Sequence, residues 1–333
     1  MKMQELFPGY YRPTEAQFKE LWENCIFVPD ANVLLNIYGY SQSTREELLT
    51  LLERLSERVR MPFQFVHEYH RNRARAIMEQ VRNYANAEKI LKDLYDQELV
   101  PRHKHPFLEA KLLKAFNRIR DDLAASRKRH EALFKSDPFL DRITTLVKVV
   151  GPAPTPKELE QIHQTAQIRC DAKLPPGYAD VKEKGVPAAY GDYIAWTQLM
   201  ALSKAEKKPA ILITDDAKED WWQIQSDRTI GPRPELIAEF HSECGALFYM
   251  YSSDQFIKFA GLYLNQPVEE GAIEEIKQRF LDNLLQTFTL KPEQPPSGAA
   301  SDKSLLASMP SEPENLKPES PSKPAADKEK AGP

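Results

Sequence analysis

The sequence predicts an α/β fold with a central, mostly parallel sheet flanked by helices, plus a helical insertion and a disordered C-terminal tail. Short apolar runs alternate with amphipathic helical patterns over the first 290 residues. No repeat of fixed period interrupts this alternation. Strands separated by helices favour parallel pairing, because the chain must cross over before it returns to the sheet. The 333 residues are enough to bury a sizeable core.

The first elements are a helix and a strand. Thr14 and Gln17 fit a capping box, which predicts that a helix begins there. Residues 25–29 form a short, continuous apolar run, which is typical of a strand buried on both faces. Asp30 follows this run, so we expect its carboxylate at the carboxyl end of the strand.

A second helix and strand follow. Ser43 and Glu46 fit another capping box. The helix that it opens has an apolar stripe, formed by Leu48, Leu49, Leu51, Leu52 and Leu55. Residues 59–63 predict the second strand, and a long helical pattern begins near Gln64.

The later part of the chain completes the α/β pattern. We expect, in order, a helix, a strand, a helix, a strand and a helix, at residues 192–205, 210–214, 235–241, 247–251 and 255–263. Residues 1–265 would thus form one domain, with a helical insertion at about 71–170 and a C-terminal helix at 266–290.

The C-terminal end, residues 291–333, has a different composition. It holds nine of the 26 prolines, no aromatic residue, and six lysines against seven acidic residues. Such a segment buries too little apolar surface to offset its ordering entropy, so we predict that it is disordered. A tether or docking role is the alternative.

Composition excludes several classes of protein. No apolar run approaches the roughly 18 to 20 residues of a membrane span, and no secretory signal is visible. Three scattered cysteines, without a C-x-x-C pair, argue against a disulfide framework and a structural zinc site. We therefore expect a cytoplasmic globular protein that does not associate with a membrane.

Charge is distributed unevenly along the chain. Residues 71–135 contain 16 Lys and Arg against nine Asp and Glu, whereas the whole chain has a net charge of −4. This segregation favours a polyanion that lies along the helical stretch. An ordinary solvated helix pair with internal ion pairs explains the same pattern equally well.

Acidic residues occur where predicted strands end or where the following helices begin: Asp30, Glu68, Asp192, Asp215, Asp216 and Asp220. The carboxyl ends of parallel strands form the usual ligand crevice of such sheets. Carboxylates that meet there repel one another, and Mg²⁺ or Mn²⁺ with its preference for oxygen ligands relieves the repulsion. For any single residue the alternative is a helix cap, as for Asp192 on its own helix.

Several blocks of sequence resemble a known family. Residues 27–36 (FVPDANVLLN) resemble the opening motif of PIN-domain nucleases. More narrowly, about residues 20–265 are similar to bacterial PIN-like proteins with a helical insertion. The other matching blocks are 62–73 (PFQFVHEYHRNR), 174–180 (LPPGYAD), 191–196 (GDYIAW) and 213–222 (ITDDAKEDWW).

The resemblance implies a Rossmann-like sheet with an acidic cluster that holds Mg²⁺ or Mn²⁺. Carried over by position, the catalytic metal ligands would be Asp30, Glu68, Asp192 and Asp216. Asp215 leaves the fourth assignment open, because both acids follow Thr214. Asn32 and Asp220 would orient the ligands from outside.

The expected substrate is nucleic acid, with RNA favoured over DNA because relatives in the wider family cleave RNA. Arg71 and Arg75 share a helix face and are candidates for phosphate contacts, although pairing with Glu68 and Glu79 is equally plausible. Lys182 and Lys184 lie in a loop that either touches substrate or merely connects elements. A partner protein or antitoxin is a further partner class that the resemblance leaves open.

The sequence thus predicts a metal-dependent nuclease. A phosphatase of the D-x-D class is disfavoured, because residues 30–32 are Asp-Ala-Asn. A receiver-like phosphoacceptor domain ranks low, because Asp30 stands alone early in the chain. The remaining alternative is a catalytically silent module that binds nucleic acid or a partner. Trp221 and Trp222 are assigned to the core rather than to base stacking.

Overall fold

The computed structural model describes residues 2–101, 103–105, 110–226 and 228–289. The chain divides into two units, Met1–Gln286 and Thr287–Pro333, and only the first is described below. The predicted disordered tail lies outside the described residues. No helix in the described part of the chain is long and apolar enough to cross a membrane.

The centre of the fold is a parallel sheet of three strands in the order β1-β4-β7. These strands are β1 (Ile26–Pro29), β4 (Ala210–Ile213) and β7 (Phe248–Tyr251). Pro29 aligns with Ile213, and Ile213 with Tyr251, so the three carboxyl ends meet at one edge. Strands β1 and β4 are buried along their whole length, as their continuous apolar sequence predicts.

Two shorter pairs of strands accompany this sheet. The parallel strands β2 (Arg60–Met61) and β3 (Val149–Val150) lie beside β1, because Val59 forms a bridge with Phe27. The antiparallel strands β5 (Trp222–Gln225) and β6 (Arg228–Pro232) form a hairpin after β4. The parallel α/β architecture predicted from the sequence is therefore confirmed.

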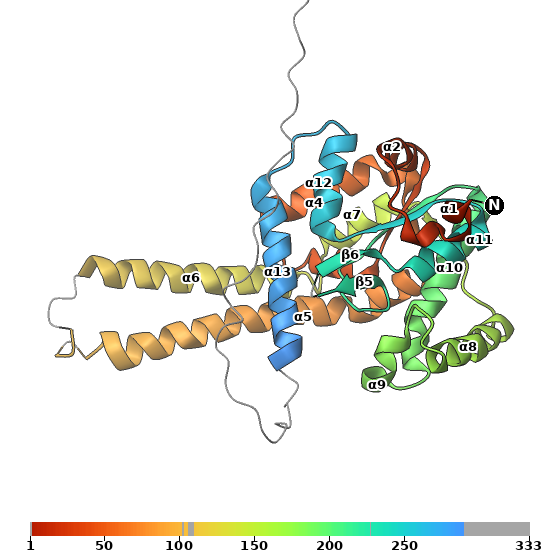
Figure 1. The fold of residues 1–333 in the computed structure, drawn as a ribbon. Coiled ribbons are helices and arrows are strands. Elements are labelled where there is room, and N and C mark those ends of the chain that lie inside the picture. Colours follow the sequence, from red (N-terminus) through yellow and green to blue (C-terminus); the bar gives the residue numbers. More distant parts are fainter. Residues whose placement is uncertain (1, 102, 106–109, 227, 290–333) are drawn as a thin grey trace, which may run out of the picture. The chain divides into compact units, whose positions relative to one another are not determined.

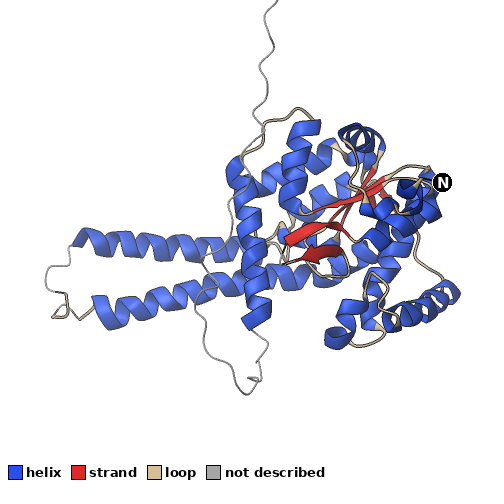
Figure 2. Cartoon of the chain, in the orientation of Figure 1, coloured by secondary structure: helices blue, strands red, loops and turns tan. Residues whose placement is uncertain are grey.

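Helices cover the sheet on both sides (Figures 1 and 2). Those of the amino-terminal half are α1 (Met3–Leu6), α2 (Glu15–Asn24), α3 (Ala31–Asn36), α4 (Gln42–Arg54), α5 (Phe63–Leu94), α6 (Ala110–Ala132) and α7 (Pro138–Leu146). Those that follow are α8 (Pro156–Asp171), α9 (Val181–Lys184), α10 (Gly191–Glu206), α11 (Pro234–Cys244), α12 (Ser253–Tyr263) and α13 (Glu270–Thr289).

Local sequence signals explain most of the amino-terminal elements. Thr14 caps α2 through a capping box with Gln17, which confirms that prediction. The predicted leucine stripe of α4 is buried, again as expected. The predicted cap at Ser43 is wrong: the cap is Ser41, whose hydroxyl accepts a hydrogen bond from the amide of Thr44. The helix therefore begins two residues earlier than predicted, and Ser43 lies inside it.

Helices α5 and α6 lie side by side and antiparallel within the predicted helical insertion (Figure 1). A polar network holds α5 to the body of the domain. The Tyr38 hydroxyl donates to Asp137 at 2.6 Å and contacts the Tyr69 hydroxyl at 2.8 Å. Arg73 of α5 forms an ion pair with Asp137, so the buried carboxylate is neutralised.

Candidate active site

Asp30 lies at the carboxyl end of β1, immediately before α3. It occupies the position that caps α3, but its side chain accepts no hydrogen bond from the backbone of that helix. Instead, its Oδ2 accepts hydrogen bonds from Asn32 Nδ2 at 2.6 Å and Thr214 Oγ1 at 2.7 Å. The carboxylate is thus held by neutral side chains from the start of α3 and from the end of β4, and not by the backbone contacts of a helix cap.

Asn32 and Thr214 form a hydrogen-bonded network that joins the ends of β1 and β4. Asn32 Oδ1 accepts a hydrogen bond from the amide of Asp215 at 3.1 Å, and Asn32 Nδ2 also contacts Thr214 Oγ1 at 3.1 Å. Thr214 Oγ1 in turn accepts from the amide of Asp216 at 3.1 Å. The orienting role predicted for Asn32 agrees with these contacts, since its side chain links Asp30 to the backbone after β4.

Glu68 reaches the same region from the second turn of α5. Its Oε1 accepts a hydrogen bond from Gln64 Nε2 at 2.6 Å. It lies against Gly191 so closely that a Cβ on that glycine would approach Oε1 to 2.9 Å. A larger residue at position 191 would therefore push the carboxylate of Glu68 away from this position.

Lys218 lies among three carboxylates. Its Nζ is 2.6 Å from Asp216 Oδ2, 2.9 Å from Asp180 Oδ1 and 3.6 Å from Asp192 Oδ2. Burial alone would lower the pKa of Lys218, but the negative charges of Asp192, Asp216 and Asp180 outweigh burial and raise it. Lys218 is thus a fixed cation within the cluster.

The loop before α9 contributes Asp180 and is held by Asp220. Asp220 Oδ2 accepts hydrogen bonds from the amides of Gly177 at 2.8 Å and Ala179 at 3.1 Å. Gly177 has a φ of 99°, which favours glycine at this turn. Lys184 forms an ion pair with Asp180 and so is engaged within the protein. Asp220 therefore supports the cluster by fixing the loop that carries Asp180.

The carboxylates near Asp30 affect one another electrostatically. Burial raises the pKa of Asp30 to about 8, and the charges of Glu68, Asp192 and Asp216 act in the same direction. The hydrogen bond from Thr214 opposes this rise. Burial likewise raises the pKa of Glu68, and the charge of Asp192 adds to the effect. These mutual effects show that the acids, though distant in sequence, share one environment.

Asp215 has different partners from those of Asp216. Its Oδ1 accepts from the amide of Ser253 at 2.9 Å, and its Oδ2 accepts from the Ser253 hydroxyl and from Asn36 Nδ2, both at 2.9 Å. Both carboxylate oxygens are therefore engaged in joining the end of β4 to α12 and α3. The assignment of Asp215 as a metal ligand stays a prediction, whereas Asp216 is the acid of this pair that contacts Lys218 in the cluster.

The remaining candidates lie around the cluster. Trp221 and Trp222 are buried, as assigned, and their indole N–H groups donate to Asp192 Oδ2 and to the Asp216 carbonyl oxygen. The side chain of Lys182 is exposed on α9, and Arg71 and Arg75 are exposed on α5. The arginines form no ion pair with Glu68 or with Glu79 within the described part of the chain.

The carboxylates of the cluster are possible oxygen ligands for a divalent cation. Among the described residues, no group of three or more His, Cys, Asp or Glu is arranged to hold a metal ion as the side chains stand. Lys218 accounts for this on one side, because its ammonium lies where Asp180, Asp192 and Asp216 converge. On the other side, neither Asp30 nor Glu68 forms an ion pair with a described residue.

The chemistry of that second side fits Mg²⁺ or Mn²⁺. Its donors are oxygens, and no described cation is close enough to form an ion pair with them, although Lys184 and Arg71 act on Glu68 from farther away. Oxygen donors of this kind are the ligands that hard divalent cations prefer. Asp220 Oδ1 is also buried without a hydrogen-bond partner in the structure, next to the charge of Asp192. This oxygen is therefore an acceptor that no described donor uses.

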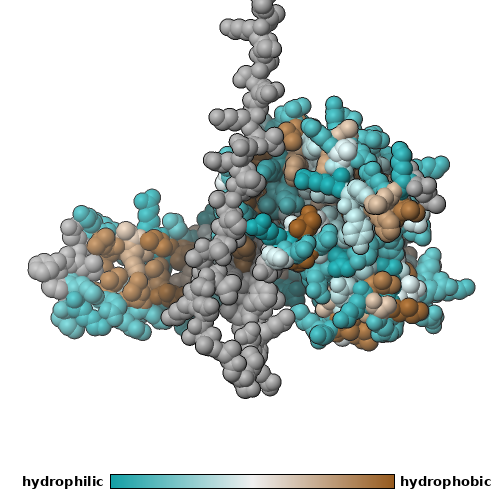
Figure 3. Space-filling model, viewed as in Figure 1, coloured by the Kyte–Doolittle hydropathy of each residue, from teal (hydrophilic) through white to brown (hydrophobic). Residues whose placement is uncertain are grey.

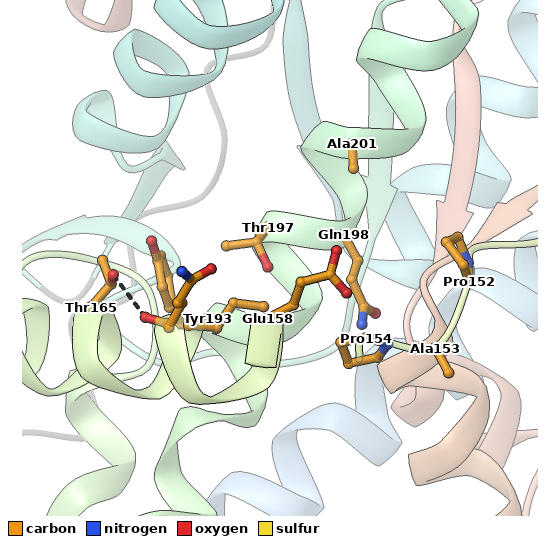
Figure 4. Close-up of a pocket in the computed structure, with 11 residues that line it drawn as sticks. Pro152, Ala153, Pro154, Glu158, Thr165, Tyr193, Thr197, Gln198 and Ala201 are labelled. Atoms are coloured by element: carbon orange, nitrogen blue, oxygen red, sulfur yellow. Dashed lines mark hydrogen bonds between the residues drawn. The ribbon is translucent and has the colours of Figure 1, made fainter. Parts of the chain in front are cut away.

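A separate pocket lies between α8 and α10. Figure 4 shows the residues that line it, among them Glu158, Tyr193 and Gln198, in a cavity of about 340 Å³. None of the clustered carboxylates lines it. Gln198 accepts a hydrogen bond from the backbone amide of Gln64 at 2.8 Å, so this wall of the pocket supports the start of α5.

Comparison with known families identifies the fold. The model of a family described as a PIN-like domain matches residues 26–236, which is well over half of the chain. The chain belongs to the PIN-like domain family. No match to a curated protein or to a solved structure was found. Membership of the PIN-like domain family relates the chain to a superfamily of nuclease type.

Within this PIN-like domain, sequence reasoning missed three residues that build the cluster: Asp180, Thr214 and Lys218. Thr214 precedes Asp215 and Asp216 in the motif, which was a usable signal. Asp180 ends the block LPPGYAD, but nothing local indicates that the residue is buried. Lys218 is two residues after Asp216 in an irregular segment, where no periodicity predicts the direction of its side chain.

Proposed function

We propose that this PIN-like protein is a metal-dependent nuclease that hydrolyses phosphodiester bonds, with RNA favoured over DNA. The observation that supports it most is the excess of acid at the carboxyl ends of β1 and β4. Asp30 and Glu68 are held by neutral donors, and the charge of Glu68 contributes to the raised pKa of Asp30. Membership of a family of nuclease type gives this acidic edge its chemical interpretation.

In this proposal Asp30, Glu68 and Asp192 hold a single Mg²⁺ or Mn²⁺ ion. When bound, such an ion neutralises charge on phosphate oxygens and activates water for in-line attack. Asn32 and Thr214 fix the orientation of Asp30, so that its oxygens do not have to reorganise. Gln64 does the same for Glu68.

Lys218 takes the place of a second cation in the proposed site. It neutralises Asp180 and Asp216 from within the protein and contributes to neutralising Asp192. In the proposed site its Nζ would also supply a positive charge that attracts the substrate's phosphates. Arg71 and Arg75 are available to bind further phosphates, because neither is engaged in an ion pair within the described residues.

A second candidate function is a catalytically silent PIN-like module. The specific observation in its favour is that Lys218 already forms ion pairs with three of the carboxylates. If this ammonium served as the only cation of the cluster, the domain would bind nucleic acid or a partner without cleaving it.

One experiment separates the two functions. The purified chain is incubated with labelled single-stranded and double-stranded RNA and DNA, with Mn²⁺ or with a chelator. The proposal predicts cleavage that needs Mn²⁺ and is lost in the Asp30→Asn variant. Binding without cleavage of any of the four substrates in Mn²⁺ would favour the silent module.

A further inference from the structure

A row of basic residues runs along one face of α5. Arg71, Arg75, Arg82 and Lys89 are separated by four, seven and seven residues and are all exposed. At 3.6 residues per turn, these separations place the four side chains within about 40° of one another around the helix. We call these four residues the basic row. It begins three residues after Glu68, so it starts at the candidate active site.

The charges of the basic row are not held in ion pairs with described residues, although the charge of Arg71 acts to lower the pKa of Glu68 from a longer distance. No ion pair involves any of its four members within the described ranges of the chain. Glu79 lies at the edge of the row, one turn after Arg75, yet the two side chains do not pair. In contrast, Arg127 on α6 is held by Glu88 and Glu131. The row is therefore set apart from the basic residues that stabilise the hairpin.

The packing of α5 on α6 leaves the basic row on the outer side. Ile77 and Val81 are buried, Glu88 pairs with α6, and the ring of Tyr84 lies 5.2 Å from that of His130. These residues are about 80° to 140° around the helix from Arg71, which places the row away from α6. Figure 3 shows hydrophilic side chains along the outer edge of the α5–α6 pair.

We propose that the basic row binds the phosphates of a single-stranded segment of nucleic acid that extends from the cleavage site along α5. The proposal rests on the proposed nuclease function and specifies the substrate further. From Arg71 to Lys89 the row is about 27 Å long. At roughly 3.4 Å per phosphate of a stacked strand, this length corresponds to about eight nucleotides.

Two features of the row favour a single strand that is bound without regard to its sequence. A straight row can follow one strand continuously, whereas each strand of a duplex winds away from a straight line. From Arg71 to the end of the helix, the other exposed residues on the same face include Ala74, Met78, Ala85, Asn86 and Asp93, and none of them has an aromatic side chain on which bases could stack. Phosphate contacts alone would then supply the binding energy.

The test measures binding by fluorescence anisotropy, in an Asp30→Asn background that prevents cleavage. The probes are oligouridylates of four and twelve nucleotides and a twelve-base-pair RNA duplex. The row is weakened by Arg82→Gln with Lys89→Gln. The matched control is Lys114→Gln with Arg118→Gln, which removes two exposed charges from α6 that form no ion pair with a described residue. Circular dichroism verifies that each variant retains its helices.

The row variant is expected to weaken binding of the twelve-nucleotide strand and to reduce its salt dependence. Each lost phosphate contact lowers the slope of log K against log salt by about 0.7, so two contacts lower it by about 1.4. The four-nucleotide strand spans about 14 Å and ends before Arg82, which is about 21 Å from Glu68 along the helix, so its binding is expected to stay unchanged. The α6 control is expected to keep the original slope.

An unchanged slope in the row variant, or an equal loss in the α6 control, would overturn the proposal. So would a loss on the duplex as large as that on the single strand. Failure of the proposed function gives a different result: the wild-type chain would cut no substrate in Mn²⁺, while the length-dependent binding would remain. If the wild-type chain cleaves nucleic acid but the row variant binds it as well as before, the proposed role of the basic row would be contradicted and the nuclease function would stand.

Discussion

On one side of the acidic cluster, Lys218 forms ion pairs with Asp180, Asp192 and Asp216, whereas on the other side Asp30 and Glu68 are held by neutral donors. The cation of the first side is covalently part of the chain and remains in place under all ionic conditions. A cation for the second side has to come from solution. We therefore expect the Lys218 side to be structural and the Asp30 side to respond to metal ions.

The largest expected effect comes from the metal-responsive side. Asp30→Asn removes a ligand charge but keeps the size of the side chain, so we expect loss of metal occupancy rather than of the fold. Loss of a residue that only orients a metal ligand costs roughly 10- to 100-fold in activity or metal affinity. Loss of the ligand itself should cost more, so we expect cleavage in Mn²⁺ to fall by more than about 100-fold. The rate is measured with labelled RNA, and thermal unfolding verifies the fold. Cleavage at the wild-type rate would remove Asp30 from the site.

The next effect is expected on the Lys218 side. Lys218→Met leaves the buried Asp180 with Lys184 alone and leaves Asp216 with no cation. In the presence of a chelator, we expect the free energy of unfolding to fall by about 3 kcal/mol, as for other partly buried pairs that lose one partner. Denaturant unfolding measures this change. Lys218→Arg keeps the positive charge, so its free energy of unfolding should fall by less. Equal stability of Lys218→Met and the wild type would show that the lysine is dispensable for the fold.

A smaller effect is expected for the residue that orients Asp30. Asn32→Ala leaves all carboxylates in place but removes the side chain that fixes one of them and accepts from the amide of Asp215. Cleavage should fall by roughly 10- to 100-fold, with a matching loss of Mn²⁺ affinity. Steady-state rates over a range of Mn²⁺ concentrations test this. A reduced rate that excess Mn²⁺ does not change would assign Asn32 to the fold rather than to the ligand.

The smallest effect on activity is expected at Asp215, the sequence neighbour of Asp216. Asp215→Asn replaces an acceptor that serves Ser253 and Asn36, so the free energy of unfolding should fall by about 1–3 kcal/mol. At a temperature where the variant is folded, its cleavage rate should stay near that of the wild type. A loss of cleavage comparable to that of Asp30→Asn would mean that Asp215 belongs to the cluster after all.

The fold was largely predictable because its strands are covered on both faces. Continuous apolar runs at residues 25–29 and 210–214 follow directly from that burial, and acids placed after them had to meet at one edge. Strands β2 and β3 contain two residues each, too few to show a period, so their pairing could not be read from the sequence. The start of α4 was misplaced because two serines compete for the cap.

The cluster was less predictable than the fold. Asp215 and Asp216 are equivalent in the sequence, and only the positions of Ser253 and Asn36 in three dimensions separate their roles. Lys218 lies outside any helix or strand, so its direction depends on the buried Asp180, which is 38 positions earlier in the chain. An electrostatic contact between residues so far apart in the chain leaves no pattern in the sequence around either residue.

The central claim is that a divalent cation binds on the Asp30 side while Lys218 serves the other side. Titration of the metal-free protein with Mn²⁺ in a calorimeter tests it directly, because it measures stoichiometry without relying on cleavage. The account predicts one ion per chain in the wild type and in Asp215→Asn, and binding at least about tenfold weaker in Asp30→Asn. Absence of Mn²⁺ binding by the wild type, or equal affinity in Asp30→Asn, would contradict the account.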